Sequence, residues 1–152
     1  MYNIFLEEVD STNLFAKKNL DNLADKSIIQ ARRQTAGRGR MQRSWIDLGG
    51  DNLFLSIVLK PSEKFNNIYS NLTQYLSVVV CKLLEEYGIQ PQIKWPNDVL
   101  VNGEKIAGIL CETVVHGQSF KGLVLGIGVN LNSSNESLNL INKSATALNL
   151  LT

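Results

Sequence analysis

Asn102 and Gly103 are the two residues that most restrict what this chain can fold into. An Asn-Gly pair readily adopts the positive φ angles of a two-residue hairpin turn. Runs typical of β-strands flank it, "DVLV" before and "EKIAGILCETVV" after, and "HGQ" predicts a second turn before "FKGLVLGIGVNLN". The second half of the chain is therefore predicted to be a series of antiparallel hairpins.

The first half alternates strands with helices. We expect strands in "NIFLEEV", "SIIQAR" and "NLFLSIVLKP", and a helix that starts in "DSTNLFAKKNL", where Asp10, Ser11 or Asn13 can cap the first turn. Apolar residues recur every three or four positions over residues 68–87, which predicts a longer helix ending at Gly88. The predicted fold class is α+β: a mixed, largely antiparallel sheet with helices packed mainly on one face.

Composition restricts the function classes. A chain of 152 residues suggests one domain, and a net charge of +1 gives no overall field that would attract nucleic acid or a membrane. Neither a signal peptide nor a run of transmembrane length is found, so a cytoplasmic location is expected. Cys81 and Cys111 are isolated, with no CxxC spacing and no histidine cluster, and are interpreted as reduced core residues.

Positive charge is concentrated in one loop, "QTAGRGRMQRSW". Gly37 and Gly39 would let a ligand approach the main chain, and Arg38, Arg40 and Arg43 offer planar cationic donors suited to carboxylate and phosphate. A solvated basic loop without a ligand is the alternative interpretation.

The predicted hairpin brings a lysine and an aspartate together. With a two-residue turn at 102–103, Asp98 lies opposite Ala107, and both share one face with Leu100 and Lys105. Asp98 and Lys105 form either a surface ion pair or a functional pair. In the second case the lysine holds an anionic substrate, while the acid holds a metal–nucleotide or orients a nucleophile.

Two shorter motifs are also open to two interpretations. "DSTN" either caps a helix or adds hydroxyl and N–H groups for a polar ligand. In "GIGVNLN", Gly126 and Gly128 lie on one strand face, where the missing side chains accommodate either a bulge, tight packing or a flat group.

The order and spacing of "DSTN", "QTAGRGR…W", "NLFLS", "KWPNDVLVNGEKIAGIL.E" and "GIGVNLN" resemble the catalytic domain of biotin–protein ligases, from about residue 8 to residue 148. The resemblance implies the class II synthetase-like fold of biotin and lipoate ligases. It also implies an ATP-dependent biotin–[acetyl-CoA-carboxylase] ligase that forms biotinyl-5′-AMP with Mg²⁺ and transfers biotin to a lysine of a biotin carrier domain. It admits a homodimer and implies neither a nucleic-acid nor a membrane partner.

The resemblance also assigns roles to individual residues. Catalytic roles fall to Lys105, Arg40 and Asp98. Biotin contacts are expected from Ser11, Thr12, Asn13, Gln34, Gly37, Arg38, Lys105, Gly108 and Leu110. ATP or adenylate contacts are expected from Arg40, Arg43, Trp45, Asn52, Lys94, Asn97 and Asn130. No metal site is expected from the protein alone, since Mg²⁺ would arrive with ATP, near Asp98.

The chain departs from the family pattern in its loop and in its length. Met41 and Gln42 stand in the gap where the family often has a further glycine, GRGRxGR, and we expect this to stiffen the loop. Residues 1–152 are expected to form a single catalytic domain, with neither an N-terminal DNA-binding domain nor the C-terminal small β-barrel of the family.

Three other functions are compatible with parts of the pattern. The chain could bind biotin or biotinyl-adenylate without catalysis, or it could be a ligase or transferase for lipoyl or octanoyl groups. An RNA-binding module using the arginine loop is disfavoured, because the chain lacks a basic face and a cluster of aromatic residues for base stacking.

Overall fold

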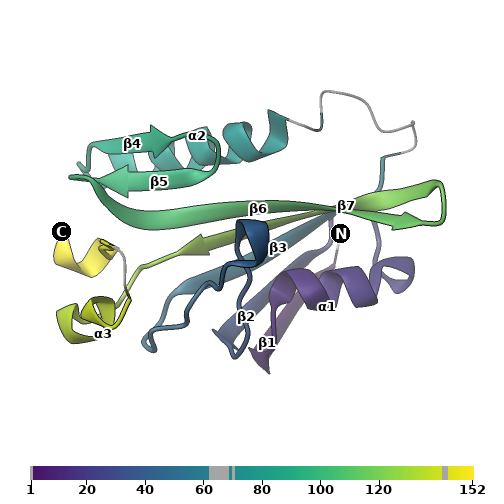
Figure 1. Cartoon of the computed structure of the whole chain (residues 1–152), viewed down its shortest axis with the longest axis horizontal. Coiled ribbons are helices and arrows are strands. Elements are labelled where there is room, and N and C mark those ends of the chain that lie inside the picture. The colour runs from purple at the N-terminus through teal and green to yellow at the C-terminus, as the bar shows by residue number, and fades with distance from the viewer. Residues whose placement is uncertain (1, 62–68, 70, 142–143) are drawn as a thin grey trace.

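A computed structural model describes residues 2–61, 69, 71–141 and 144–152, and in these residues it shows one seven-stranded mixed sheet (Figure 1). The strands are β1 (Asn3–Val9), β2 (Ile28–Gln34), β3 (Leu53–Leu59), β4 (Pro91–Lys94), β5 (Asp98–Val101), β6 (Glu104–His116) and β7 (Ser119–Val129). Their order in the sheet is β1-β2-β3-β7-β6-β5-β4, with β1 and β2 parallel and every other neighbouring pair antiparallel. The predicted mixed, largely antiparallel sheet is confirmed.

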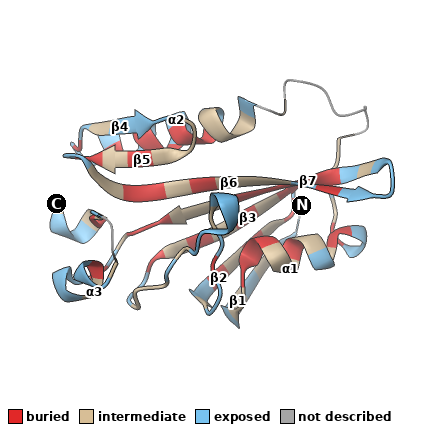
Figure 2. Cartoon of the chain, viewed as in Figure 1, coloured by how far each residue is buried: buried red, intermediate tan, exposed pale blue. Residues whose placement is uncertain are grey.

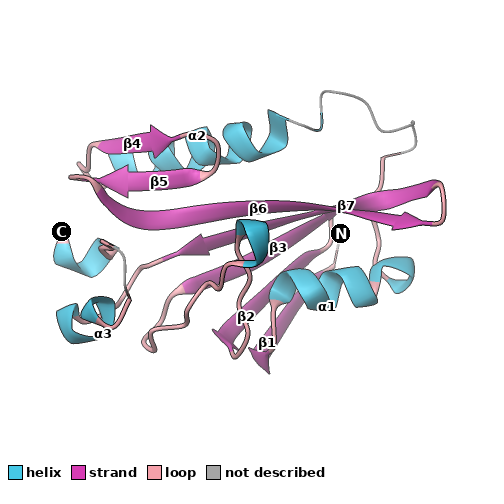
Figure 3. Cartoon of the chain, viewed as in Figure 1, coloured by secondary structure: helices cyan, strands magenta, loops and turns pink. Residues whose placement is uncertain are grey.

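Helices connect and flank these strands (Figure 3). The α-helices are α1 (Thr12–Lys18), α2 (Leu72–Glu85) and α3 (Asn135–Asn139), and short 3-10 turns occur at η1 (Leu20–Asn22), η2 (Arg40–Gln42) and η4 (Leu148–Leu150). Ser11 caps α1, because its hydroxyl accepts a hydrogen bond from the Leu14 N–H at 3.4 Å. The helix predicted over 68–87 is confirmed as α2, while Ile68 lies outside the described residues.

The structure differs from the sequence prediction in where the helices pack, because α1 and α2 lie on opposite faces of the sheet. Val124 belongs to the same apolar cluster as Ala16 of α1, whereas its neighbour Leu125 belongs to the cluster that contains Val80 of α2. Successive residues in the middle of β7 are buried, as the red segments of that strand show in Figure 2. A central strand that is apolar on both faces needs a cover on each, so helices on one face alone would leave half of its apolar surface in water.

The two predicted hairpin turns are present. Asn102 and Gly103 both have positive φ angles, of 53° and 83°, and join β5 to β6, and Gly117, with φ of 61°, lies in the turn from β6 to β7. Figure 1 shows β6 and β7 as the long central pair, with β4 and β5 beside α2 at one end and β1, β2 and β3 beside α1 at the other. Among the described residues, no helix is long and apolar enough to cross a membrane.

The register of the β5–β6 hairpin differs from the prediction by one residue. Asp98 pairs with Gly108 rather than with Ala107, because β6 carries a bulge at Ile106, opposite the step from Val99 to Leu100. Ala107 therefore faces α2 and is fully buried there, while Gly108 takes its place beside Asp98.

Candidate active site

A cavity of about 540 Å³ opens on the α1 face of the sheet, a size typical of small-molecule sites. It is bounded by the start of α1, the loop between β2 and β3, the β4–β5–β6 hairpins, the end of β7 and the segment after α3. Its lining includes Ser11, Thr12, Asn13, Gln34, Arg38, Arg40, Arg43, Trp45, Lys94, Asn97, Asp98, Lys105, Gly108, Leu110 and Asn130.

Glycines form the floor of the cavity, and the Trp45 ring rests on them. A Cβ at Gly108 would come within 2.8 Å of Trp45 Cζ3, and one at Gly128 within 2.7 Å of Trp45 Cε2. A Cβ at Gly126 would likewise clash with Asn13 Oδ1. The sequence left room at Gly128 for a flat group, and in the structure that group is the Trp45 ring. Trp45 Nε1 is buried and has no hydrogen-bond partner among the described residues, so its N–H remains available as a hydrogen-bond donor.

Lys105 and Asp98 form an ion pair at the wall of the cavity. Lys105 Nζ lies 2.7 Å from Asp98 Oδ1, and the two side chains are 31% and 25% exposed. Both project from the cavity side of the β5–β6 hairpin, where the bulge places Gly108 next to them. Lys105 Nζ also lies 5.2 Å from the centre of the Trp45 ring, within the range of a cation–π interaction. The pair is only partly open to water and faces the cavity.

The basic loop folds over the cavity and contacts the hairpin across it. Arg40 Nη1 donates to Asn97 Oδ1 at 3.3 Å, and the Asn97 amide donates in turn to the Ile109 carbonyl at 3.0 Å. Met41 and Gln42 have φ angles of 54° and 59°, in the left-handed region that favours glycine. The position at which the family pattern has a further glycine is thus a position where this chain adopts a glycine-like conformation with a bulky residue.

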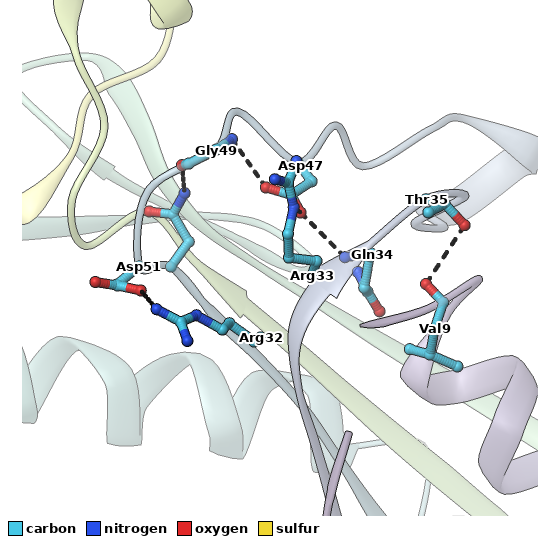
Figure 4. A network of polar contacts seen from close by, with 9 residues as sticks. Val9, Arg32, Arg33, Gln34, Thr35, Asp47, Gly49 and Asp51 are labelled. Atoms are coloured by element: carbon cyan, nitrogen blue, oxygen red, sulfur yellow. Dashed lines mark hydrogen bonds and ion pairs between the residues drawn. The ribbon is translucent and has the colours of Figure 1, made fainter. Parts of the chain in front are cut away.

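Asp47 ties the two ends of this loop together (Figure 4). Its side chain is 5% exposed and accepts from the Gln34 N–H at 3.0 Å and from the Gly49 N–H at 2.9 Å. It also lies 3.4 Å from Arg33 Nε. One buried carboxylate therefore fixes the base of the loop, while Arg38, Arg40 and Arg43 are exposed above it.

A polar network closes the end of the cavity nearest α1. Gln34 Oε1 accepts from the Thr12 N–H at 2.8 Å, and the buried Ser56 hydroxyl lies 2.8 Å from Thr12 Oγ1 and 2.6 Å from Asn13 Oδ1. The Asn13 amide donates to Glu112 Oε2 at 3.0 Å. Ser11 therefore caps the helix, as one interpretation of "DSTN" predicted, while Thr12 and Asn13 line the cavity.

The charge around the cavity is strongly positive although the chain is nearly neutral. Among the described residues, its lining includes one carboxylate, from Asp98, and five cationic side chains: Arg38, Arg40, Arg43, Lys94 and Lys105. Such an arrangement lowers the cost of bringing two anionic groups together, because their repulsion is offset by preplaced cations. No group of three or more His, Cys, Asp or Glu side chains within the described ranges could hold a metal ion.

Two of the predicted site residues do not line the cavity. Gly37 lies behind it, where a Cβ would meet the Trp45 carbonyl, and Asn52 holds the turn after β7 by accepting from the Leu131 and Asn132 N–H groups at 2.8 and 3.1 Å. Asn130 is 5% exposed, and its amide donates to the Thr146 carbonyl at 3.1 Å. Gly37 and Asn52 therefore support the site, and the structure brings the other predicted residues together around one cavity.

Sequence reasoning missed several contributors. Residues from the loop and the C-terminal segment also line the cavity: Ser44, Ile46, Ile141, Ser144 and Ala145. The C-terminal segment reaches the site through the Lys105 backbone, whose N–H donates to the Ser144 carbonyl at 3.2 Å. No periodicity marks "KSATALN", so only the fold reveals this contact. Ser56 and Glu112 were missed as well, although both lie within motifs quoted above.

Comparison with known proteins agrees with this geometry. The model of the Biotin/lipoate A/B protein ligase family matches residues 5–130. The bifunctional ligase/repressor BirA of Bacillus spizizenii is 36% identical over 135 residues, covering 88% of this chain and 41% of that protein. The biotin–[acetyl-CoA-carboxylase] ligase of Paracoccus denitrificans is 38% identical over 132 residues, covering 83% of this chain and 53% of that one. The biotin protein ligase from Aquifex aeolicus, solved with biotin and ATP, matches with a TM-score of 0.80 and 36% identity, over 99% of this chain and 61% of that one.

The chain therefore belongs to the Biotin/lipoate A/B protein ligase family. Several of its relatives are biotin–protein ligases, as the sequence motifs predicted. It spans about half or less of the length of the curated relatives described here.

Proposed function

We propose that this protein is a biotin–protein ligase. In the first step, a biotin carboxylate oxygen attacks the α-phosphorus of ATP, which gives biotinyl-5′-AMP and releases pyrophosphate. In the second step, the neutral amine of a lysine on a biotin carrier domain attacks the acyl carbon. AMP leaves, the amide bond forms, and the amine loses a proton. The observation that carries the proposal is the convergence of five cationic side chains on one glycine-floored cavity.

The residues divide the work by position. The glycine floor and the Trp45 ring supply an apolar wall, and Thr12 and Gln34 supply polar groups at the opposite end from the hairpin. We assign Lys105 to the reacting carboxylate and phosphate, since its ammonium is already fixed by Asp98 and Trp45. Arg40 and Arg43 lie on the loop and would neutralise the phosphates as it closes.

Magnesium is assigned to ATP rather than to a site in the protein. Mg²⁺ commonly binds through one or two carboxylates together with substrate phosphates and water. Asp98 is the one carboxylate among the lining residues that the structure describes, which fits a metal that arrives with the nucleotide. We also assign Asp98 to orient the incoming amine of the carrier lysine. The proposal includes a cytoplasmic location, which the unpaired Cys81 and Cys111 favour.

The test is mass spectrometry of a biotin carrier domain incubated with the protein, biotin and Mg-ATP. We expect the carrier to gain the mass of one biotinyl group, and to gain none without ATP or with Lys105→Ala. Parallel reactions with lipoate and octanoate test the other acyl groups of the family. Pyrophosphate release is measured in each reaction. Binding of biotin without pyrophosphate release would show a non-catalytic binder, and acylation by lipoate or octanoate in place of biotin would overturn the substrate assignment.

A further inference from the structure

Glu112 lies next to the cavity without lining it. It follows the cavity residue Leu110 by two positions on β6 and so projects from the same face of the sheet. Glu112 Oε2 accepts from Asn13 Nδ2 at 3.0 Å, and Glu112 Oε1 accepts from Lys17 Nζ at 2.9 Å. The carboxylate is 20% exposed and the Lys17 side chain 28%. The pair is therefore well shielded and in direct contact with the α1 end of the site.

Glu112 is ionised in this setting. Burial raises its pKa, but the hydrogen bonds from Lys17 and Asn13 and the positive charges of Lys17 and Arg38 outweigh burial and hold the pKa below the usual value of a glutamate. An ionised carboxylate can only accept hydrogen bonds. The NH₂ group of Asn13 therefore points toward Glu112, where it also donates to the Leu110 carbonyl at 3.3 Å, and its carbonyl oxygen points the other way, toward Ser56.

The orientation of Asn13 then determines the next two hydrogen bonds. The Ser56 hydroxyl has one proton and lies 2.6 Å from Asn13 Oδ1, an oxygen that can only accept, so Ser56 donates there. Ser56 is also 2.8 Å from Thr12 Oγ1, and because its own proton goes to Asn13, this contact is a hydrogen bond when Thr12 donates. The other acceptor for the Thr12 proton is Gln34 Oε1, at 3.2 Å, which is also part of the protein. Thr12 thus commits its proton to the protein and keeps a lone pair for the cavity that it lines.

We propose that Glu112 is a positioning residue that acts through Asn13 and Ser56 to make the Thr12 hydroxyl an acceptor for an N–H group of the ligand. The inference rests on the proposed function, in which that N–H group belongs to the cyclic urea of biotin. Lys17 holds Glu112 in place and keeps it ionised. The ligand itself touches neither Glu112 nor Lys17.

An exchange of the two polar side chains tests the coupling. Asn13→Asp would place two carboxylates about as close as Asn13 and Glu112 are now, and we expect the Kd for biotin to rise at least tenfold. Adding Glu112→Gln should restore affinity to within about threefold of wild type, because the introduced glutamine amide can donate to the introduced aspartate, which still accepts from Ser56. Glu112→Gln alone should weaken binding less than Asn13→Asp, since a glutamine amide can also present its oxygen to Asn13. Lys18→Gln, which removes the exposed ion pair with Asp10, is the matched control.

A pH profile separates positioning from general packing. The charged groups that face Glu112 are Lys17 from α1 and Arg38 from the loop. Cys111 precedes Glu112 on β6, and the partner of Glu112 on the neighbouring strand β7 is the apolar residue Val124. In Lys17→Met the main opposing charge is gone, so burial should raise the pKa of Glu112. A protonated Glu112 can donate as well as accept, so it no longer fixes the orientation of Asn13. Biotin affinity of this variant should therefore fall as the pH is lowered from 8 to 5, while the wild-type profile stays flat.

Isothermal titration with biotin and thermal unfolding of every variant complete the experiment. Restored affinity in the double variant and an acid-sensitive Lys17→Met support the inference. Additive losses in the double variant, or wild-type affinity in Glu112→Ala, would overturn it. Failure of the wild type to bind biotin would instead refute the proposed function. In that case the positioning role is tested without ligand, by the NMR resonances of the Asn13 side-chain amide. These resonances should shift in Glu112→Ala, and an unchanged spectrum would refute the positioning role.

Discussion

Lys105 Nζ lies 5.2 Å from the centre of the Trp45 ring, so the lysine of the hairpin meets the aromatic residue of the basic loop across the cavity. Because the same ammonium is 2.7 Å from Asp98, its position is fixed on two sides before a ligand arrives. A cation fixed in advance stabilises developing negative charge without the cost of reorganising at the moment of reaction.

Lys105→Ala should therefore abolish biotin adenylation while leaving the fold intact. Removing one preplaced electrostatic contact costs roughly a hundredfold or more in rate, about 2.7 kcal/mol. Pyrophosphate release measures the effect, and Lys121→Ala, an exposed lysine on β7 outside the cavity, is the control. A Lys105→Ala variant with near-normal turnover would remove this residue from the catalytic assignment.

Gly128→Ala should displace the Trp45 ring from the cavity floor. The added Cβ would lie 2.7 Å from Trp45 Cε2, closer than carbon atoms approach in folded proteins, so the ring must move. Fluorescence in a Trp95→Phe background reports on Trp45, since the chain has two tryptophans. We expect a shifted emission maximum and weaker biotin binding. Gly39→Ala is the control, because its nearest neighbour would be 3.4 Å away, and equal spectra for the two alanine variants would contradict this packing.

Gln42→Gly should stabilise the loop. Gln42 has a φ of 59°, and a residue with a side chain pays roughly 1–2 kcal/mol for the left-handed conformation, of which about 0.4–1 kcal/mol is offset by the greater freedom of glycine in the unfolded chain. The net gain should be about 0.5–1 kcal/mol, measured by chemical denaturation. Ser44→Gly, in the same loop at a residue without positive φ, should instead destabilise the protein. If both substitutions destabilise equally, the left-handed conformation at Gln42 carries no cost.

Trypsin should cut the ligand-free protein first within the basic loop. Arg38, Arg40 and Arg43 are exposed there, and the loop is anchored mainly by Trp45 and Asp47, so local opening should cost little free energy. A ligand at a hundredfold excess over its Kd disfavours the open form by about 2.7 kcal/mol, so biotin with Mg-ATP should slow cleavage, and more than biotin alone. Asp47→Ala should accelerate it. Fragment masses over time give the rates, and identical rates with and without ligands would show that the loop does not close over substrate.

The amino-acid sequence determined the local elements well. The Asn102-Gly103 turn, the cap at Ser11 and the periodicity of α2 depend on residues a few positions apart, and each formed as predicted. The resemblance to one family, carried by glycines, arginines and polar pairs in a fixed order, also implied many of the residues that line the cavity.

Only the tertiary structure decided the features that depend on distant partners. The bulge at Ile106 moves Ala107 to the α2 face, and the pattern of apolar residues does not specify it, since both faces of the central strands are buried. The partners of Glu112 likewise cannot be read from the sequence, because Asn13 and Lys17 reach it from α1, about a hundred residues away along the chain. Hydrogen-bond geometry and close packing act over a few ångströms in space, whereas the sequence records order along the chain. Which side chains share a hydrogen bond in this site was therefore settled by folding.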